Sequence, residues 1–272
     1  MTPAAAVPVV RWLDTRAVTV SEDGLRELGP GDRARAAAFT FAADRHRYRV
    51  AHIALRRTLS GYTGIPPGQL EFGREPCPCC GGPGGRPALA GHRGLHFSLA
   101  HSGDAVAIAV AVEPVGIDIE RMPGRCTCDL ASAMHGDDAA IVGRLPEPQR
   151  HDAIMRWWTG AEAVLKCTGA GIGHGMDGFG VLGGRPPDGS GGARRAAGCW
   201  LMPLAAPPGY AAALALRSAR PPAGVTVSGR GQRGAPDRRA WRDHGAGAGP
   251  RSQGRHSAAP PGGGGTAPAD VR

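Results

Sequence analysis

One stretch of the chain constrains its fold more than any other: the uninterrupted apolar run AVAIAVAV at residues 105–112. The run has the length of a strand and no polar side chain, which is typical of a strand buried on both faces. Glu113 and Pro114 break it, and VGIDIE at residues 115–120 resumes as a second extended segment. Because so short a break separates the two segments, we expect them to pair as a β-hairpin.

Two long helices are predicted, each with a defined end. In the first half, apolar and long side chains recur at helical spacing from Asp44 onwards, and Gly61 and Gly64 supply the stop. In the second half, a helical region ends with RHDAIMRWWTGAEAVLKCTG at residues 150–169. A shorter helix is expected after Ser21, whose side chain can cap it.

Five further segments are predicted to be strands, and the Gly-, Pro- and Cys-rich stretch at residues 73–93 is predicted to be a loop. The strand candidates are residues 7–14, 95–101, 179–182, 199–204 and 210–216. Both halves of the chain therefore run from helix to strands. This order permits two similar subdomains without requiring them.

After Arg217 the composition changes to Gly, Pro, Ser, Ala and Arg without apolar periodicity. Such a segment cannot bury enough apolar surface to offset the entropy of ordering, so residues 218–272 are predicted to be disordered. Of the formal net charge of +9, this segment holds nine Arg and three Asp, which leaves +3 for residues 1–217. The charge therefore gives little support to a nucleic-acid-binding fold, and a passive tail is preferred over a binding arm.

Nothing in the sequence indicates secretion or membrane insertion. No basic segment followed by an apolar run begins the chain, and no stretch approaches the roughly 18–20 apolar residues of a membrane span. The seven Cys residues are an odd number and fit a reduced compartment better than a disulfide framework. We therefore expect a cytoplasmic protein.

Two acids stand out because of their spacing. Asp118 and Glu120 are separated by one residue in a predicted strand, so both carboxylates point to the same face. Side by side they would repel each other, and each would have a raised pKa unless a cation lay between them. A strand end that emerges into solvent carries acids just as readily, and on this feature alone that explanation is preferred.

Glu162 and Lys166 lie four residues apart on the second predicted helix and therefore share a face. Lys166 is the only Lys among 32 basic residues, which indicates a specific role because ammonium and guanidinium groups are not equivalent. A surface ion pair would also explain the spacing, but Trp157, Trp158 and Leu165 favour partial burial. Three carboxylates from two elements would suit Mg²⁺, which takes oxygen ligands and keeps substrate phosphates in its shell.

His101 and a group of cysteines are two further candidates. His101 ends a predicted strand before a Gly turn, where it could present a donor to phosphate or make a structural hydrogen bond. The segment CPCCGG at residues 77–82 crowds three Cys together, whereas a closed zinc site needs two pairs of ligands at wider spacing. A Gly-rich loop that carries thiols is preferred over a metal site.

Three motifs, taken in order, resemble those of the 4′-phosphopantetheinyl transferase superfamily in its surfactin-synthetase-activating type. They are FSLAHSG at residues 97–103, GIDIE at residues 116–120 and WTGAEAVLKCTGAG at residues 158–171. The stretches GREPCPCCGGPGGRP at residues 73–87 and DRHRYRVAHIALRR at residues 44–57 are similar to a loop and the first long helix of actinobacterial members. The resemblance extends over residues 7–217.

The resemblance implies a pseudo-twofold α+β fold with coenzyme A and Mg²⁺ in the cleft between two similar subdomains. These would be an N-terminal subdomain at residues 1–111 and a C-terminal subdomain with the metal site at residues 112–217, followed by the disordered tail at 218–272. By motif position, the metal ligands would be Asp118, Glu120 and Glu162. The residues that contact coenzyme A would be Arg47, Arg86, His101 and Lys166, with Arg35 as a weaker candidate.

The activity implied is transfer of 4′-phosphopantetheine from coenzyme A to a serine of an acyl or peptidyl carrier protein, with release of adenosine 3′,5′-bisphosphate. Glu162, or a water that it orients, would act as the base, and Lys166 would neutralise charge as the P–O bond breaks. The carrier would belong to polyketide, nonribosomal peptide or fatty acid synthases, and the enzyme would be a monomer. The alternative is a degenerate member that binds coenzyme A or carrier with little activity.

The chain departs from the family motifs at two positions. Ala161 stands where the family has a Lys before the helical Glu, and Ala100 stands where it has a Ser before the His. We expect the first change to remove a charge near the metal and the carrier surface, and the second to remove a hydrogen bond to phosphate. Both would lower activity or alter the choice of carrier.

Overall fold

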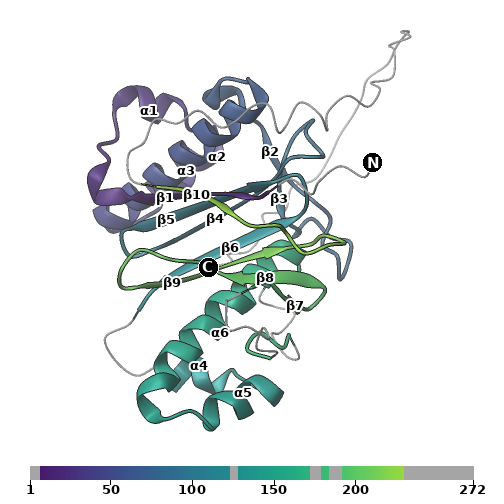
Figure 1. Cartoon of the computed structure of the whole chain (residues 1–272). Helices are drawn as coiled ribbons and strands as arrows, with labels where there is room; N and C mark the ends of the chain where they lie inside the picture. The colour runs from purple at the N-terminus through teal and green to yellow at the C-terminus, as the bar shows by residue number, and fades with distance from the viewer. Residues whose placement is uncertain (1–6, 123–127, 172–178, 184–191, 230–272) are drawn as a thin grey trace.

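A computed structural model describes residues 7–122, 128–171, 179–183 and 192–229 of the 272-residue chain. Within these ranges the chain forms two four-stranded β-sheets that pack face to face (Figure 1). The helices α1, α2 and α3 lie on the outer side of one sheet, and α4, α5 and α6 lie on the outer side of the other. The α+β fold class expected from the sequence is confirmed.

Most of the predicted helices and strands are present, together with several that were not predicted. The first set is β1 (Val9–Asp14), η1 (Thr15–Ala17), α1 (Glu22–Arg26), α2 (Pro30–Ala37), α3 (Ala42–Thr63), η2 (Pro67–Gln69), β2 (Phe72–Arg74), β3 (Pro87–Leu89), β4 (His96–Ser102) and β5 (Ala105–Ala111). The second set is β6 (Val115–Arg121), α4 (Cys128–Ser132), α5 (Gly136–Gly143), α6 (Glu147–Thr168), β7 (Arg194–Ala196), β8 (Cys199–Pro203), β9 (Tyr210–Leu216) and β10 (Thr226–Gly229).

The first sheet has the strand order β10-β1-β5-β4, and β5 is antiparallel to both of its neighbours. All seven residues of β5 are buried, as its apolar sequence predicts. α3 covers the outer face because Leu55 and Leu59 of its apolar stripe pack against Val106 and Ile108. Gly64 ends α3 with a φ of 76°, the left-handed conformation that favours glycine.

The second sheet has the order β6-β9-β8-β7, with every neighbouring pair antiparallel. α6 covers its outer face, where Trp157 and Val164 pack against Leu201. Gly169 ends α6 with a φ of 79°, as Gly64 ends α3. In both sheets the central antiparallel strand (β5 or β9) lies between the strand that precedes the long helix (β1 or β6) and a strand that follows it (β4 or β8).

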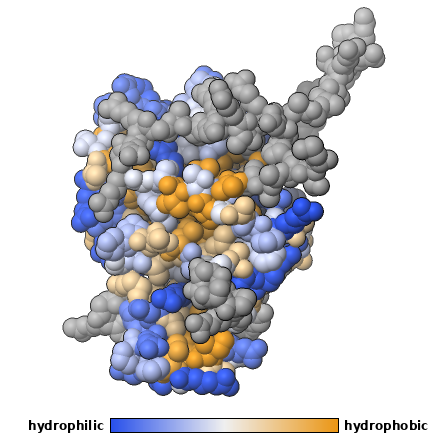
Figure 2. Space-filling view, viewed as in Figure 1, coloured by the Kyte–Doolittle hydropathy of each residue, from blue (hydrophilic) through white to orange (hydrophobic). Residues whose placement is uncertain are grey.

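A further apolar layer lies between the two sheets. The small side chains of β5, Ala105, Ala107 and Ala109, pack in one cluster with the larger Ile117 and Ile119 of β6. Alternating small and large residues across facing positions lets the two surfaces interdigitate closely. On the face shown in Figure 2, apolar residues gather over the sheets in the middle of the molecule, and hydrophilic residues dominate its outer parts.

The predicted hairpin between residues 105–112 and 115–120 is wrong. β5 pairs with β1 and β4, whereas β6 pairs with β9, so the chain passes from one sheet to the other at Glu113 and Pro114. The Pro114 carbonyl accepts a hydrogen bond from the Arg217 amide at 2.9 Å. The residue expected to form the turn therefore extends the β6–β9 pairing instead.

The segment at residues 179–182 is not a strand, although the sequence predicts one. The amides of Val181 and Leu182 donate to the two carboxylate oxygens of Asp138 at 2.9 and 2.7 Å. The Asp138 side chain of α5 thus accepts the two backbone N–H groups that would otherwise donate to the carbonyl groups of a neighbouring strand. The apolar sequence serves instead to bury Val181, which is 0% exposed against α6.

β10 corrects the prediction that disorder begins at residue 218. Thr226–Gly229 pairs in parallel with β1, with Thr226 opposite Val9. An edge strand such as β1 presents unpaired backbone groups, and β-branched residues such as Val227 favour the extended conformation. All four residues of β10 are exposed, so no apolar pattern marks them in the sequence. The remainder of the predicted tail, residues 230–272, lies outside the described residues.

Some elements were not predicted at all. The expected loop at residues 73–93 contains β3, which pairs with β2 to form a two-stranded hairpin, and α2 and β7 are also additional. Within the part of the chain that the structure describes, no helix combines the length and apolar character needed to cross a membrane.

Candidate functional site

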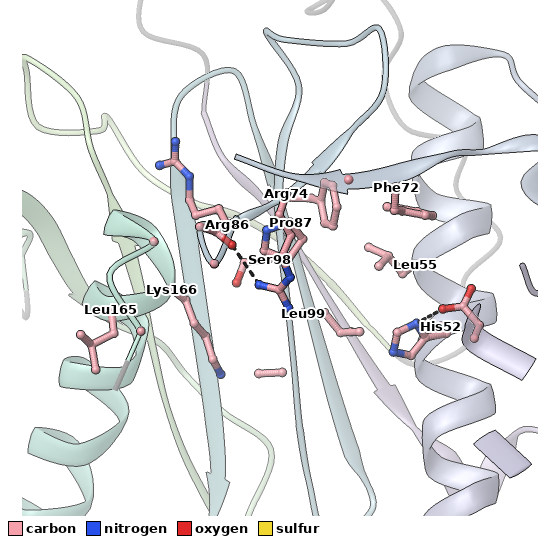
Figure 3. Close-up of a pocket in the computed structure, with 18 of the residues that line it drawn as sticks. His52, Leu55, Phe72, Arg74, Arg86, Pro87, Ser98, Leu99, Leu165 and Lys166 are labelled. Carbon is pink, nitrogen blue, oxygen red and sulfur yellow. Dashed lines mark hydrogen bonds and ion pairs between the residues drawn. The ribbon is translucent and has the colours of Figure 1, made fainter. Parts of the chain in front are cut away.

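A cavity of about 980 Å³ opens between α3, the β2–β3 hairpin, β4 and the C-terminal part of α6. In Figure 3, Lys166 on α6 and His52 on α3 lie on opposite sides of it. Basic side chains dominate the ionisable lining: Arg35, His52, Arg56, Arg74, Arg86, His101 and Lys166, against the acids Asp32 and Glu162. The cavity is therefore suited to a ligand that carries several negative charges.

The three acids singled out in the sequence lie beside this cavity. Asp118 is 3% exposed and Glu162 is 8% exposed, while Glu120 is partly buried. Lys166 Nζ donates to Asp118 Oδ1 at 2.6 Å. The second oxygen, Asp118 Oδ2, is buried and has no hydrogen-bond partner among the described residues. The ammonium group of Lys166 thus contributes one positive charge to a cluster of three carboxylates.

Burial is the main cause of a raised pKa at all three acids. The charge of Lys166 opposes this rise, whereas the neighbouring carboxylates add to it at Glu120 and Glu162. The predicted repulsion between Asp118 and Glu120 is therefore present, and Glu162 shares in it. Buried negative charge in excess of positive charge is costly, and an added cation would offset it.

Glu120 is held by a serine. Ser102 Oγ donates to Glu120 Oε2 at 2.6 Å and accepts the Arg121 amide at 3.1 Å. Four residues earlier on β4, Ser98 Oγ accepts the Ile117 amide, also at 3.1 Å. The two amide contacts join residues 19 positions apart, so β4 and β6 run parallel, linked by hydroxyls in place of backbone carbonyls. We call these contacts of Ser98 and Ser102 with β6 the serine seam.

A glycine allows β6 to approach α6. A Cβ atom on Gly116 would lie 2.0 Å from the Ala163 carbonyl oxygen and 2.4 Å from the Cys167 amide nitrogen, so no larger residue fits without a backbone shift. Gly116 precedes Asp118 by two residues, and Cys167 follows Lys166. The close approach therefore brings the acids of β6 within reach of the α6 side chains.

All but one of the basic residues expected to contact coenzyme A line the cavity: Lys166, His101, Arg86 and the weaker candidate Arg35. Arg47 is not among the lining residues. Its guanidinium donates to the Asp44 carboxylate at 2.8 Å and to the Gly103 carbonyl. These bonds tie α3 to the turn that follows β4, so the described contacts of Arg47 are structural.

Arg86 and His101 occupy different parts of the cavity wall. Arg86 forms an ion pair with Glu75 and donates from Nη1 to the Cys167 carbonyl at 2.6 Å, which links the β2–β3 hairpin to α6. His101 is exposed at the end of β4, where desolvation and then the charge of Arg47 lower its pKa. The lowered pKa favours the neutral imidazole, which has one N–H group to donate.

A closed ionic network in the wall was not predicted from the sequence. Asp32 of α2 accepts from Arg56 Nε at 2.8 Å and pairs with His52 at 3.1 Å. Arg56 also donates to the carbonyls of Pro67 and Leu70. Burial would raise the pKa of Asp32, but the hydrogen bonds from His52 and Arg56 outweigh it and lower the pKa. The available signal was a single Arg on the apolar stripe of α3.

In the described part of the chain, no three His, Cys, Asp or Glu side chains form a group arranged to hold a metal ion. This holds for the cysteine-rich turn, where Cys77 is buried while Cys79 and Cys80 are exposed. The turn is closed by a backbone hydrogen bond from Gly81 to Cys77 at 2.8 Å. The segment is thus a turn that carries three closely spaced thiols.

The two departures from the family motifs are both buried. Ala161 is 0% exposed and lies in the core beside Trp157. Ala100 is 4% exposed and lies midway between Ser98 and Ser102. Since side chains alternate along a strand, a hydroxyl at this position would face β6 and belong to the serine seam.

Residues 114–202, which include β6 and α6, match the family model described as the 4′-phosphopantetheinyl transferase superfamily. The chain is 34% identical over 159 residues to the 4′-phosphopantetheinyl transferase HetI of Nostoc sp., a match that covers 56% of this chain and 63% of the relative. It is 31% identical over 150 residues to the 4′-phosphopantetheinyl transferase psf-1 of Bacillus pumilus, covering 54% of this chain and 60% of the relative.

The match spans about three fifths of the length of these curated relatives. The region matched by the family model contains Asp118, Glu120, Glu162 and Lys166, the group that the fold brings together beside the cavity. The motif FSLAHSG precedes this region and lies on β4, directly against β6. Over residues 114–202 the chain is therefore similar to the 4′-phosphopantetheinyl transferase superfamily.

Proposed function

We propose that the chain transfers the 4′-phosphopantetheine group of coenzyme A to a serine of an acyl or peptidyl carrier protein. The observation that carries the proposal is the placement of Lys166 and three carboxylates at the edge of a cavity lined mainly by basic side chains. A nucleotide with a pyrophosphate matches such a cavity in charge. The relatives similar to this chain are 4′-phosphopantetheinyl transferases, which supports the same activity.

Magnesium fits the acidic group by the chemistry of its oxygen donors, although in the described structure these three side chains are not arranged as a closed metal site. Asp118, Glu120 and Glu162 offer acceptor oxygens of the kind that Mg²⁺ prefers, and the buried Asp118 Oδ2 is without a hydrogen-bond partner among the described residues. These three residues would hold the ion. When bound, a divalent cation supplies positive charge that stabilises phosphate oxygens during phosphoryl transfer.

The chain's own side chains would take the remaining roles. Glu162 would accept the proton of the carrier serine directly or through a water that it orients. Lys166 would neutralise charge on the leaving phosphate, and His101 would donate its N–H to a phosphate oxygen. Arg86 and Arg35 would face the nucleotide end. Adenosine 3′,5′-bisphosphate would then be released.

The repeated strand order of the two sheets supports a pseudo-twofold pair of subdomains at residues 1–111 and 112–217. The cavity draws its lining from both, with His101 on one side and Lys166 on the other. Because one chain would supply both subdomains, the enzyme would be a monomer. It would act in the cytoplasm on carrier proteins of polyketide, nonribosomal peptide or fatty acid synthases.

The test is to incubate the full chain with coenzyme A, Mg²⁺ and an apo-carrier of each of these three kinds, and to measure the intact mass of the carrier. The expected result is a phosphopantetheine adduct on at least one carrier, with an equal amount of adenosine 3′,5′-bisphosphate. Binding of coenzyme A without any adduct would overturn the proposal in favour of a degenerate family member. Glu162→Ala is the matched inactive variant.

A further inference from the structure

The contact between Ser102 and Glu120 has no part in the transfer step as described, although Glu120 is one of the proposed metal ligands. Ser102 Oγ lies 2.6 Å from Glu120 Oε2, the same distance as Lys166 Nζ from Asp118 Oδ1. The two acids of β6 are thus each held from outside their own strand, one by an ammonium group and the other by a hydroxyl.

The direction of the hydrogen bond is determined by the backbone. The Arg121 amide donates to Ser102 Oγ at 3.1 Å, so this oxygen acts as the acceptor toward β6. The hydroxyl hydrogen is then left for Glu120, whose carboxylate can only accept when it is ionised. A hydrogen bond to an ionised acceptor is stronger than one between neutral groups, and it orients the carboxylate.

The seam contains a natural comparison for this arrangement. Ser98 accepts the Ile117 amide at 3.1 Å just as Ser102 accepts the Arg121 amide, but no hydrogen bond joins Ser98 to an acid of the cluster in the described structure. Both serines therefore link β4 to β6, and Ser102 alone of the two also reaches a proposed ligand. The link to Glu120 is a second task, separate from strand pairing.

We propose that Ser102 is a positioning residue that sets the orientation of the Glu120 carboxylate for metal binding. This inference rests on the proposed metal site of Asp118, Glu120 and Glu162. Ser102 Oγ holds Oε2 from the β4 side, and the Trp158 indole N–H also hydrogen-bonds this carboxylate. The lone pairs that these two donors leave are available to a cation. Groups that hydrogen-bond to metal ligands commonly change metal affinity by about 10–100-fold when removed.

The experiment measures Mn²⁺ binding to the full chain by electron paramagnetic resonance, with coenzyme A present and no carrier, so that no turnover occurs. A titration of Mn²⁺ with coenzyme A alone is subtracted. The variants are Ser102→Ala, which removes the hydroxyl, Ser102→Thr, which keeps it, and Ser98→Ala, which removes a seam hydroxyl without a carboxylate contact. Because Ser98 lines the cavity, coenzyme A is kept at saturation for every variant. Thermal denaturation of each variant reports the loss of strand pairing separately.

The expected result is that Ser102→Ala weakens Mn²⁺ binding about 10-fold or more, Ser102→Thr restores most of it, and Ser98→Ala lowers thermal stability with unchanged affinity. Unchanged affinity in Ser102→Ala, or an equal loss in Ser98→Ala, would overturn the inference while leaving the metal site in place. If the unsubstituted chain and Glu162→Ala bind Mn²⁺ alike, the metal site itself fails, and the inference fails with it.

Discussion

On α3 the buried Arg56 is 5% exposed and meets the Asp32 carboxylate and two backbone carbonyls. On α6 the buried Glu162 is 8% exposed and lies close to the negative charges of Asp118 and Glu120. Both helices are 22 residues long, end at a left-handed glycine and cover a four-stranded sheet. The same architecture thus pairs the buried positive charge of Arg56 in the first half. In the second half it leaves the buried negative charges of the acidic cluster in excess of the single positive charge of Lys166.

This difference contrasts a charge that is paired within the fold with a group of charges that is proposed to bind a ligand. A buried charge that the protein satisfies internally contributes to a defined fold, and removal of its partner is costly. A cluster of like charges in a partly buried site is unfavourable for folding and is retained for ligand binding or chemistry. The two networks should therefore respond in opposite ways to the loss of one carboxylate.

The largest effect is expected for Glu162→Gln, which removes one negative charge from the acidic cluster at nearly constant volume. Carrier modification should fall by about 100-fold or more, because a general base contributes roughly 10²–10⁴ to the rate. The free energy of unfolding should stay the same or rise. Intact mass of the carrier and thermal denaturation give the two readouts. Turnover at the original rate would show that the acid is misassigned.

Asp32→Asn is expected to lower the free energy of unfolding by about 3–5 kcal/mol, because Arg56 keeps its buried charge without a partner. The lowered pKa of Asp32 means that its stabilisation is present above its unfolded pKa of about 3.9 and is lost as the pH falls through the folded value. Denaturant unfolding at pH 7 should therefore show the full difference, and the difference should shrink below about pH 4.

The double variant Asp32→Asn with Arg56→Met is the control for that prediction. It removes the stranded charge as well as its partner, so part of the lost stability should return. If Asp32→Asn is as stable as the unsubstituted chain, the buried charge of Arg56 does not depend on Asp32. The contrast between the two halves would then fail.

A smaller loss is expected for Gly116→Ala, where the added Cβ would meet the backbone of α6. Overpacking of this kind costs about 1–3 kcal/mol, and the shift of β6 should also reduce carrier modification. Gly31→Ala is the matched control, since nothing lies within 4 Å of its Cβ position. Denaturant unfolding should give a clearly lower free energy of unfolding for Gly116→Ala than for Gly31→Ala. Equal stability would mean that β6 and α6 can separate freely.

The smallest effect is expected for Ala100→Ser, which adds a third hydroxyl to the serine seam. Its position is 19 residues before Ile119, the same offset as in the two existing contacts. Because the Ile119 amide also hydrogen-bonds the Asp118 carboxylate, the new hydroxyl would share this donor, and the free energy of unfolding should rise by about 0.5 kcal/mol, the low end for a hydrogen bond. Thermal denaturation measures the change, and a fall in stability would show that the seam has no room for another polar group.

Local features of the fold were predictable because neighbouring residues determine them. Gly64 and Gly169 mark the ends of α3 and α6 in the sequence and in the structure. The burial of β5 followed from its composition. The partner of β6 was not predictable in this way, because the choice between β5 and β9 depends on residues about 100 positions away.

The same limit applies to the site. Glu162 and Lys166 share a helix face, so their proximity follows from helical spacing. The bond between Lys166 and Asp118 joins residues 48 positions apart, and that of Ser102 with Glu120 depends on two strands from different sheets. The order of the motifs indicates which segments contribute to the site. The parallel contact of β4 with β6 appears only in the folded chain.

β10 completes the first sheet late in synthesis of the chain. Its partner β1 begins at Val9, whereas β10 begins at Thr226. The edge strand β1 is therefore synthesised more than two hundred residues before the strand that pairs with it. N-terminal elements generally fold first as a chain emerges from the ribosome. The open edge of β1 would therefore face other nascent chains for most of translation, and the last described strand covers it only when both sheets have been made.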